Sequence, residues 1–415
     1  MSAFRLWMDG WIGCSFAFGF CSCIFASALY AMSPIGSSLT DGWVHPGNVL
    51  VLLMLIGPDI IQISLAQLSG CVFTPVAFSF GWVAYSFKNL SLVFSQNKLV
   101  PEPDFSSIVI NGQTGYTRDN HSWVLSRILR DFDYWKPEPI ENRLREVLTE
   151  ATNRDTEKAR QDGRDPPPPR EQAGLCVSIF RTSPGREAGV PVTDWLYYSG
   201  IVVAIIQLGI SVIPSAVHNE WAILVVTGSG ILLAFATGAL PQWKMEKWGH
   251  IRTPNKTVIL TRGNGAQHAL VIVGDENFLD LEKLAVSGPK GSLLTRFCTV
   301  PLALLWIAHL FTVLGIKEDP WFLLAIGGIG MLHSVVVAGL PRRPEALGLH
   351  LDFEACIAQP KVMLTLKEVE RRYPNIGASM LSTFFPGRLR REEEMWWNAT
   401  PHERTLQELW DACDL

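Results

Sequence analysis

The chain has 415 residues, of which 48% are hydrophobic and only 18% are charged, and its formal net charge is −4 at pH 7. This composition is too apolar for an ordinary soluble protein of this length, and we expect no nucleic-acid partner. The apolar residues are concentrated in seven windows with almost no charge, at residues 10–32, 47–66, 70–87, 195–217, 221–240, 293–316 and 321–340. Windows of this length predict an α-helical multi-pass membrane protein of about seven spans, whose first partner is the lipid bilayer.

The first window has two interpretations. Arg5 precedes it and small residues occur between Ala26 and Ala31, which is the pattern of a cleaved secretory signal. However, the apolar run is longer than the core of a typical signal and suits a membrane span. We therefore expect the mature protein to retain it.

The second window contains a carboxylate. Asp59 lies near its middle, directly after Gly57 and Pro58, and shares a helix face with Gln62. Because a carboxylate is costly in hydrocarbon, Asp59 is a candidate general acid or cation ligand, with Gln62 beside it. The alternative is structural: Pro58 interrupts the helix and Asp59 caps the next one.

The first long polar segment predicts mixed structure. Residues 107–111 read as a strand, 112–115 as a turn and 123–135 as a helix. Residues 153–172 are polar and rich in proline, so we expect a disordered linker there.

The following apolar windows contain an internal repeat. Seven residues recur at a spacing of 100: Trp221, Leu224, Gly228, Gly230, Leu232, Leu240 and Pro241 return as Trp321, Leu324, Gly328, Gly330, Leu332, Leu340 and Pro341. The recurrence predicts repeated pairs of spans, and the small residues predict close helix packing.

Each pair of spans is followed by a similar polar pattern. Residues 256–262 and 269–273 predict two strands around a turn at 263–265, and 277–285 predict a helix. The polar residues after the last span can be interpreted in the same way. They predict strands at 350–357 and 361–365 around a turn at 358–360, followed by a helix at 366–373. We therefore predict three units of two spans, a β-hairpin and a helix, with the hairpins paired in a small cytosolic α+β cap.

The turn at 263–265 and its neighbours form the densest group of polar residues outside the membrane windows. Its glycines permit close approach by an anionic group, Arg262 is the cation that would bind it, and His268 is a candidate acid or base. Gln267, Asp275 and Glu276 lie nearby in sequence. The competing interpretation is a plain two-strand turn, which needs the same glycines and asparagine.

Other polar residues predict no metal or cofactor site. His309 and His333 differ in depth within their spans, so we expect separate hydrogen bonds to neighbouring helices. Cys176, Cys356 and Cys413 are scattered along the chain and are expected to be cytosolic thiols. No motif indicates a cofactor, and no residues are assigned as metal ligands.

The distribution of basic residues predicts the orientation. Lys244, Lys247, Lys290, Arg342 and Arg343 flank the spans on the side of the polar segments, which places those segments in the cytosol. The predicted division is 1–100 (spans 1–3), 101–193 (cytosolic hairpin, helix and linker), 194–241 (spans 4–5), 242–292 (cytosolic hairpin and helix), 293–341 (spans 6–7) and 342–415 (cytosolic C-terminal segment).

Residues 239–243, 256–285 and 79–85 carry a resemblance. The sequences Ala-Leu-Pro-Gln-Trp and Leu-Thr-Arg-Gly-Asn-Gly are similar to those of a group of multi-pass membrane proteins from filamentous fungi, some encoded near specialised-metabolism genes. The resemblance implies a metabolic role in the endoplasmic reticulum or another endomembrane. We expect an accessory enzyme acting on a lipophilic intermediate. The alternatives are a small-metabolite transporter and a membrane scaffold for soluble biosynthetic enzymes.

Overall fold

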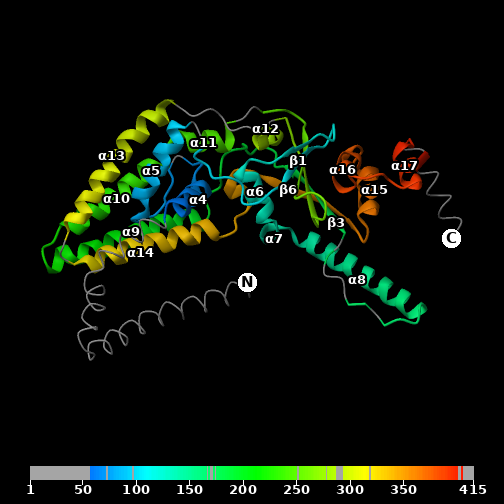
Figure 1. Cartoon of the computed structure of the whole chain (residues 1–415), viewed down its shortest axis with the longest axis horizontal. Coiled ribbons are helices and arrows are strands. Elements are labelled where there is room, and N and C mark those ends of the chain that lie inside the picture. The colour runs from blue at the N-terminus through cyan, green and yellow to red at the C-terminus, as the bar shows by residue number, and fades with distance from the viewer. Residues whose placement is uncertain are drawn as a thin grey trace.

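The structure, a computed structural model, describes residues 57–71, 73–95, 98–165, 167–168, 172, 174–249, 252–276, 278–286, 293–316, 319–400 and 403–404. The described chain is elongated, with a helical bundle at one end, a β-sheet beside it and a group of helices at the other end (Figure 1). The predicted first span, at residues 10–32, lies outside the described residues.

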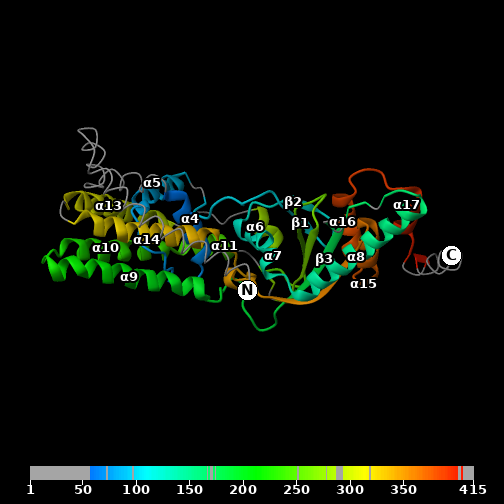
Figure 2. The same cartoon turned by 90° about the horizontal axis from the view of Figure 1, so that it is seen from below.

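Four long helices form the frame of the bundle. They are α9 (Trp195–Val217), α10 (Ala222–Gly238), α13 (Leu293–Gly315) and α14 (Pro320–Gly339). Each is long and apolar enough to cross a membrane, and they coincide with the last four predicted windows. In Figure 2, α9 and α10 lie below α13 and α14. Large apolar side chains such as Ile205, Leu232 and Phe297 remain exposed on the outer faces, as expected for helices surrounded by lipid.

The segment before these helices departs from the prediction. Its described residues, 57–71 and 73–95, contain the helices α4 (Pro58–Leu68) and α5 (Gly81–Phe94), and residues 73–80 form neither helix nor strand. The prediction of one continuous span over 70–87 is therefore wrong. Both short helices pack beside α13 and α14, towards the end of the bundle nearest the sheet (Figure 1).

Residues 73–80, which we call the extended segment, thread between the long helices. The carbonyl oxygens of the segment are satisfied by side chains: Gln207 Nε2 donates to Phe78 O (2.7 Å), and Tyr197 Oη donates to Phe73 O (2.8 Å). Non-helical backbone is tolerated in a membrane bundle only where such partners exist. Gly230 and Gly330, which correspond in the 100-residue repeat, both face Phe78. These two glycines thus admit the extended segment between helices.

The end of α4 is held by two cations. Lys247 Nζ donates to Ala66 O (2.8 Å) and Ser69 O (2.6 Å), and the Arg342 guanidinium donates to Gln67 O. Basic groups at the last carbonyls of a helix satisfy unpaired acceptors and complement the helix dipole. Lys247 lies on α11 (Pro241–Trp248), directly after α10.

The sheet has six strands in the order β2-β1-β4-β5-β3-β6. The strands are β1 (Ile108–Asn111), β2 (Thr117–Asp119), β3 (Leu175–Thr182), β4 (Thr257–Thr261), β5 (His268–Val273) and β6 (Leu351–Gln359). All neighbours are antiparallel except β3 and β5, so the sheet is mixed. The strand and turn predicted at 107–115 are present and continue into β2, and the hairpin predicted at 256–273 is present.

The third predicted hairpin is wrong. Residues 362–365 belong to α15 (Val362–Arg372), and β6 pairs instead with β3, a strand absent from the prediction. The predicted linker is partly wrong as well, because α8 (Glu138–Gln161) continues through residues 153–161. Its charged side chains make i,i+4 pairs such as Arg145 with Glu141, which stabilise an exposed helix.

Both faces of the sheet are covered. Alternate residues such as Val258, Leu260 and Ile272 join the core shared with the bundle, whereas Ile259 and Val271 face α15 and α16 (Ile376–Phe384). The remaining elements are α6 (Trp123–Arg130), α7 (Phe132–Trp135), α12 (Leu281–Val286), the 3-10 helix η1 (Pro344–Leu347) and α17 (Arg391–Asn398).

Candidate functional site

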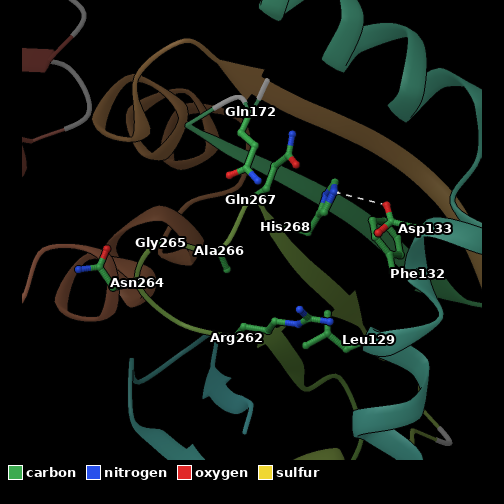
Figure 3. Close-up of a pocket in the computed structure, with 10 residues that line it drawn as sticks. All are labelled: Leu129, Phe132, Asp133, Gln172, Arg262, Asn264, Gly265, Ala266, Gln267 and His268. Atoms are coloured by element: carbon green, nitrogen blue, oxygen red, sulfur yellow. Dashed lines mark ion pairs between the residues drawn. The ribbon is translucent and has the colours of Figure 1, made fainter. Parts of the chain in front are cut away.

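A cavity of about 450 Å³ opens where the β4–β5 loop meets α6 and α7. Its lining residues come from three parts of the chain: Leu129, Phe132 and Asp133 from α6 and α7; Arg262, Asn264, Gly265, Ala266, Gln267 and His268 from the loop and the start of β5; and Gln172. Figure 3 shows these side chains around the opening. The structure therefore brings the two predicted site residues Arg262 and His268 into one cavity.

The β4–β5 loop owes its shape to two glycines. Gly263 and Gly265 have φ of +94° and +83°, a conformation that other residues adopt only with strain. The Ala266 amide donates to Gly263 O (3.1 Å), which closes the loop, and Thr261 Oγ1 donates to His268 O (3.0 Å) at its base. The loop is thus both a turn, as one interpretation held, and a wall of the cavity.

Asp275 and Glu276 do not join this cavity. They follow the far end of β5, where the Asp275 amide donates to Thr182 Oγ1 (3.0 Å). His268 begins β5 and these two residues follow its end, so the whole length of the strand lies between them.

The opposite wall is tied to the bundle. Arg127 Nη1 on α6 donates to Ala338 O (3.1 Å) at the end of α14, and the buried Asp131 carboxylate accepts from the Arg342 amide (3.0 Å). Burial raises the pKa of the Asp131 carboxyl, against the lowering effect of Arg130. These contacts fix α6 and α7 against the cytosol-facing end predicted for α14, so the cavity has a rigid link to the membrane helices.

His268 and Asp133 face each other across the cavity (Figure 3). His268 Nε2 lies 4.0 Å from Asp133 Oδ1, and Phe132 packs edge-on against the imidazole with ring centroids 5.0 Å apart. Burial opposes ionisation of Asp133, but Lys136, His268 and Arg262 outweigh it and lower the pKa of its carboxyl. A carboxylate beside an imidazole is an arrangement found at general acid–base sites.

Arg262 supplies a cation at the same cavity. Its guanidinium stacks over the Phe105 ring, 4.1 Å from the centroid, which fixes the orientation of the planar group. An oriented guanidinium binds a carboxylate or a phosphate through paired hydrogen bonds.

Two cysteines lie behind His268. Cys176 is its register partner across β3 and β5, so the two side chains share a face of the sheet, and Cys176 Sγ lies 3.3 Å from Cys356 Sγ. The hydrogen bond with Cys356 lowers the pKa of the Cys176 thiol, against burial, and His268 lowers it further. The same contact raises the pKa of Cys356. Although Cys176 and Cys356 are far apart along the chain, they lie side by side because β3 and β6 are neighbours.

Asp59 and Gln62 are in different surroundings. Asp59 lies in the first turn of α4 with 78% of its side chain exposed and forms an ion pair with Lys88, whereas Gln62 is buried and donates to Leu99 O (2.6 Å). The described residues do not enclose Asp59 and Gln62 in a common cavity. Asp59 lies in the first turn of α4, but the N-cap residue is Gly57 and no side chain caps the helix, so the predicted capping role of Asp59 is wrong.

The two membrane histidines form separate hydrogen bonds, as predicted. Ser199 Oγ lies 2.9 Å from His333 Nε2, and Ser229 Oγ lies 3.3 Å from His309 Nδ1. Among the residues that the structure describes, no group of three His, Cys, Asp or Glu side chains is placed to hold a metal ion.

The sequence did not indicate that Asp133 and Cys176 lie beside His268. Each is far from His268 along the chain, and neither belongs to a recognisable motif. Cys176 stands in the apolar run 175–180, whose composition indicates a strand. This composition was the only feature of the sequence that could have indicated the position of Cys176.

Comparison of the chain with family models, with curated proteins and with solved structures finds no match.

Proposed function

We propose that this chain is a membrane-embedded enzyme that transfers a proton on a lipophilic, anionic substrate, and that the cavity beside β5 is its active site. The observation that carries the proposal is that His268 Nε2 and the Asp133 carboxylate face one cavity, 4.0 Å apart, with Arg262 on its wall. His268 is the general acid or base, Asp133 stabilises its charged form, and Arg262 binds the anionic group of the substrate.

The position of the cavity supports a lipophilic substrate. Leu129 and Phe132 provide an apolar wall, and the same helices contact the end of α14. A molecule that partitions into the bilayer therefore has a short route to the reacting groups. In the proposed setting the substrate is an intermediate of fungal specialised metabolism, as the sequence resemblance suggests, and soluble enzymes of the same pathway act before or after this one.

The proposal includes a topology. The chain crosses an endomembrane, such as that of the endoplasmic reticulum, about seven times, with the sheet in the cytosol. The basic residues at the sheet end of the bundle support this orientation, since Lys244, Arg342 and Arg343 all lie there. The 100-residue repeat supports a common origin of the pairs α9–α10 and α13–α14.

A transporter is the second candidate, and the extended segment favours it. Interrupted membrane segments form the binding sites of many transporters, and residues 73–80 interrupt the helices here. Phe78, Trp82 and Trp306 fill the space around this segment. In this alternative, Asp59 and its partner Lys88 are the charged groups that respond to a transported ion.

The test uses the source organism with the gene deleted and then restored as wild type, His268→Gln or Asp59→Asn. If the proposal is right, His268→Gln lowers product formation by roughly 100-fold or more, since general acid–base groups contribute factors of this size. An unprocessed precursor then accumulates in the cells, while Asp59→Asn behaves as wild type. Mass spectrometry of cell and medium extracts measures both compounds.

His121→Gln is the matched control, because His121 is exposed and lies outside the cavity. The amount of each variant in the membrane fraction is measured by immunoblot, so that loss of protein is not mistaken for loss of activity. Unchanged product with His268→Gln at normal abundance would refute the enzyme proposal. Retention of finished product inside cells with Asp59→Asn would instead establish transport.

A further inference from the structure

A second cavity, of about 400 Å³, lies where α9 and α14 meet the sheet end of the bundle. Asp194 caps the start of α9 through a hydrogen bond to the Tyr197 amide (3.0 Å), and Pro341 follows α14 directly. The cavity shares no lining residue with the proposed active site. It is lined by Tyr134, Arg186, Val192, Asp194, Trp195, Leu196, Pro341, Arg342, Arg343, Glu345 and Ala346.

The charges of this cavity are incompletely paired. Arg342 forms a bidentate pair with Asp194, with nitrogen–oxygen distances of 2.7 and 2.9 Å, so these two charges compensate each other. Arg186 and Arg343 are exposed and form no ion pair with any residue that the structure describes. The cavity therefore offers two guanidinium groups to an external anion.

The cavity also contains an acceptor without a donor. Glu345 Oε2 is buried and has no hydrogen-bond partner in the described part of the chain. A buried carboxylate oxygen without a donor is unfavourable. A ligand that carries an ammonium group next to its anionic group would satisfy it.

An apolar stripe begins at the mouth of the cavity. Trp195, Tyr198, Val202 and Ile205 follow each other at intervals of three and four along α9, so they lie on one face, and each is more than half exposed. Trp and Tyr at the start of a membrane helix are typical of the headgroup level, and the aliphatic residues beyond them suit acyl chains. The stripe thus runs from the charged cavity into the hydrocarbon region.

We infer that this cavity binds the headgroup of an aminophospholipid. The phosphate lies between Arg186 and Arg343, the primary ammonium donates to Glu345, and the acyl chains follow the stripe on α9. This inference depends on the membrane position of α9 and α14, and it is independent of the proposed reaction.

The test is lipid-dependent thermal stabilisation of the full chain, purified in detergent. Dioctanoyl phosphatidylethanolamine is expected to raise the unfolding temperature saturably, at concentrations at least fivefold lower than dioctanoyl phosphatidylcholine, whose quaternary ammonium has no N–H donor. The double variant Arg186→Gln/Arg343→Gln is expected to need at least tenfold more phosphatidylethanolamine. Glu345→Gln is expected to lose the preference between the two lipids.

The control is Arg154→Gln/Arg388→Gln, which removes the same charge from exposed sites away from the cavity and should behave as wild type. Size-exclusion chromatography verifies that each variant is folded. Equal lipid dependence of wild type and the cavity variants would overturn the inference. Phosphoethanolamine, which lacks acyl chains, distinguishes a lipid from a free headgroup as the ligand. If it stabilises the protein as well as phosphatidylethanolamine does, the assignment to a lipid is overturned.

Discussion

Single glycines decide whether the bundle can form around the extended segment. A Cβ atom on Gly330 would lie 1.7 Å from Phe78 O, and one on Gly230 would lie 2.6 Å from the Phe78 ring. By contrast, a Cβ atom on Gly228 or Gly328 meets nothing within 4 Å. Glycines two positions apart therefore have different roles, although sequence analysis assigned all four to helix packing.

Gly330→Ala is expected to destabilise the bundle because the backbone of Phe78 cannot move away from the added methyl group. Overpacking of this kind costs about 1–3 kcal/mol or more. The measurement is the thermal unfolding temperature of the detergent-purified chain, followed by size-exclusion chromatography. Gly328→Ala is the matched control and should leave the temperature unchanged. Equal temperatures for the two variants would contradict the position of the extended segment.

A network of charged side chains joins α12 to the start of β4. Lys256 Nζ lies 2.7 Å from both Asp280 Oδ1 and Glu282 Oε2, and Arg118 on β2 also contacts Glu282, at 2.6 Å. Burial alone would raise the pKa of the Asp280 carboxyl, but the hydrogen bonds and charge of Lys256 lower it. Asp280 also accepts from the Lys283 amide (3.2 Å), so it fixes the start of α12.

Asp280→Asn is expected to lower the unfolding temperature at pH 7 by about 1–3 °C, which corresponds to a loss of about 1–2 kcal/mol for a chain of this size. Because the folded pKa of Asp280 is below the unfolded value, the stabilisation is complete above the unfolded pKa, about 3.9, and is lost as pH falls through the folded value. The difference in unfolding temperature between wild type and Asp280→Asn should therefore become smaller as the pH is lowered. The exposed Asp352→Asn provides the control. If the difference in unfolding temperature stays constant with pH, the stabilisation does not depend on the charge of Asp280.

Across the whole molecule, the sheet connects segments that are far apart in the chain. Its strands come from before, between and after the four long helices, and β3 and β6 meet although the helices lie between them in sequence. All strands therefore have to lie on one side of the bundle, which agrees with the proposed cytosolic orientation.

This arrangement predicts the result of protease protection on sealed microsomes. Epitope tags inserted at Gly163 and Gly387 are expected to be digested without detergent, because Gly163 follows α8 and Gly387 lies between α16 and α17, which are at the sheet end of the molecule. A tag at Asn219, between α9 and α10, is expected to be protected until detergent is added. Tags at Gly163 and Gly387 on opposite sides of the membrane would contradict the single sheet.

The local pattern of the sequence was sufficient for most elements. The four long helices follow from apolar runs, and the hairpins at 107–119 and 256–273 follow from alternation and glycine turns. These signals are local, since length, periodicity and turn residues act over a few neighbours. Arg262 and His268 were found for the same reason, because they flank a glycine turn.

Contacts between distant parts of the chain determined the elements that the local pattern did not predict. Residues 70–87 carry no charge, yet residues 73–80 are not helical because Gln207, Tyr197 and paired glycines on other helices accommodate an extended backbone. Likewise, β6 pairs with β3 rather than with a hairpin partner, which places Cys356 beside Cys176. Apolar composition predicts that a segment is buried, but its partners, and hence its conformation and the side chains it brings together, depend on packing between distant parts of the chain.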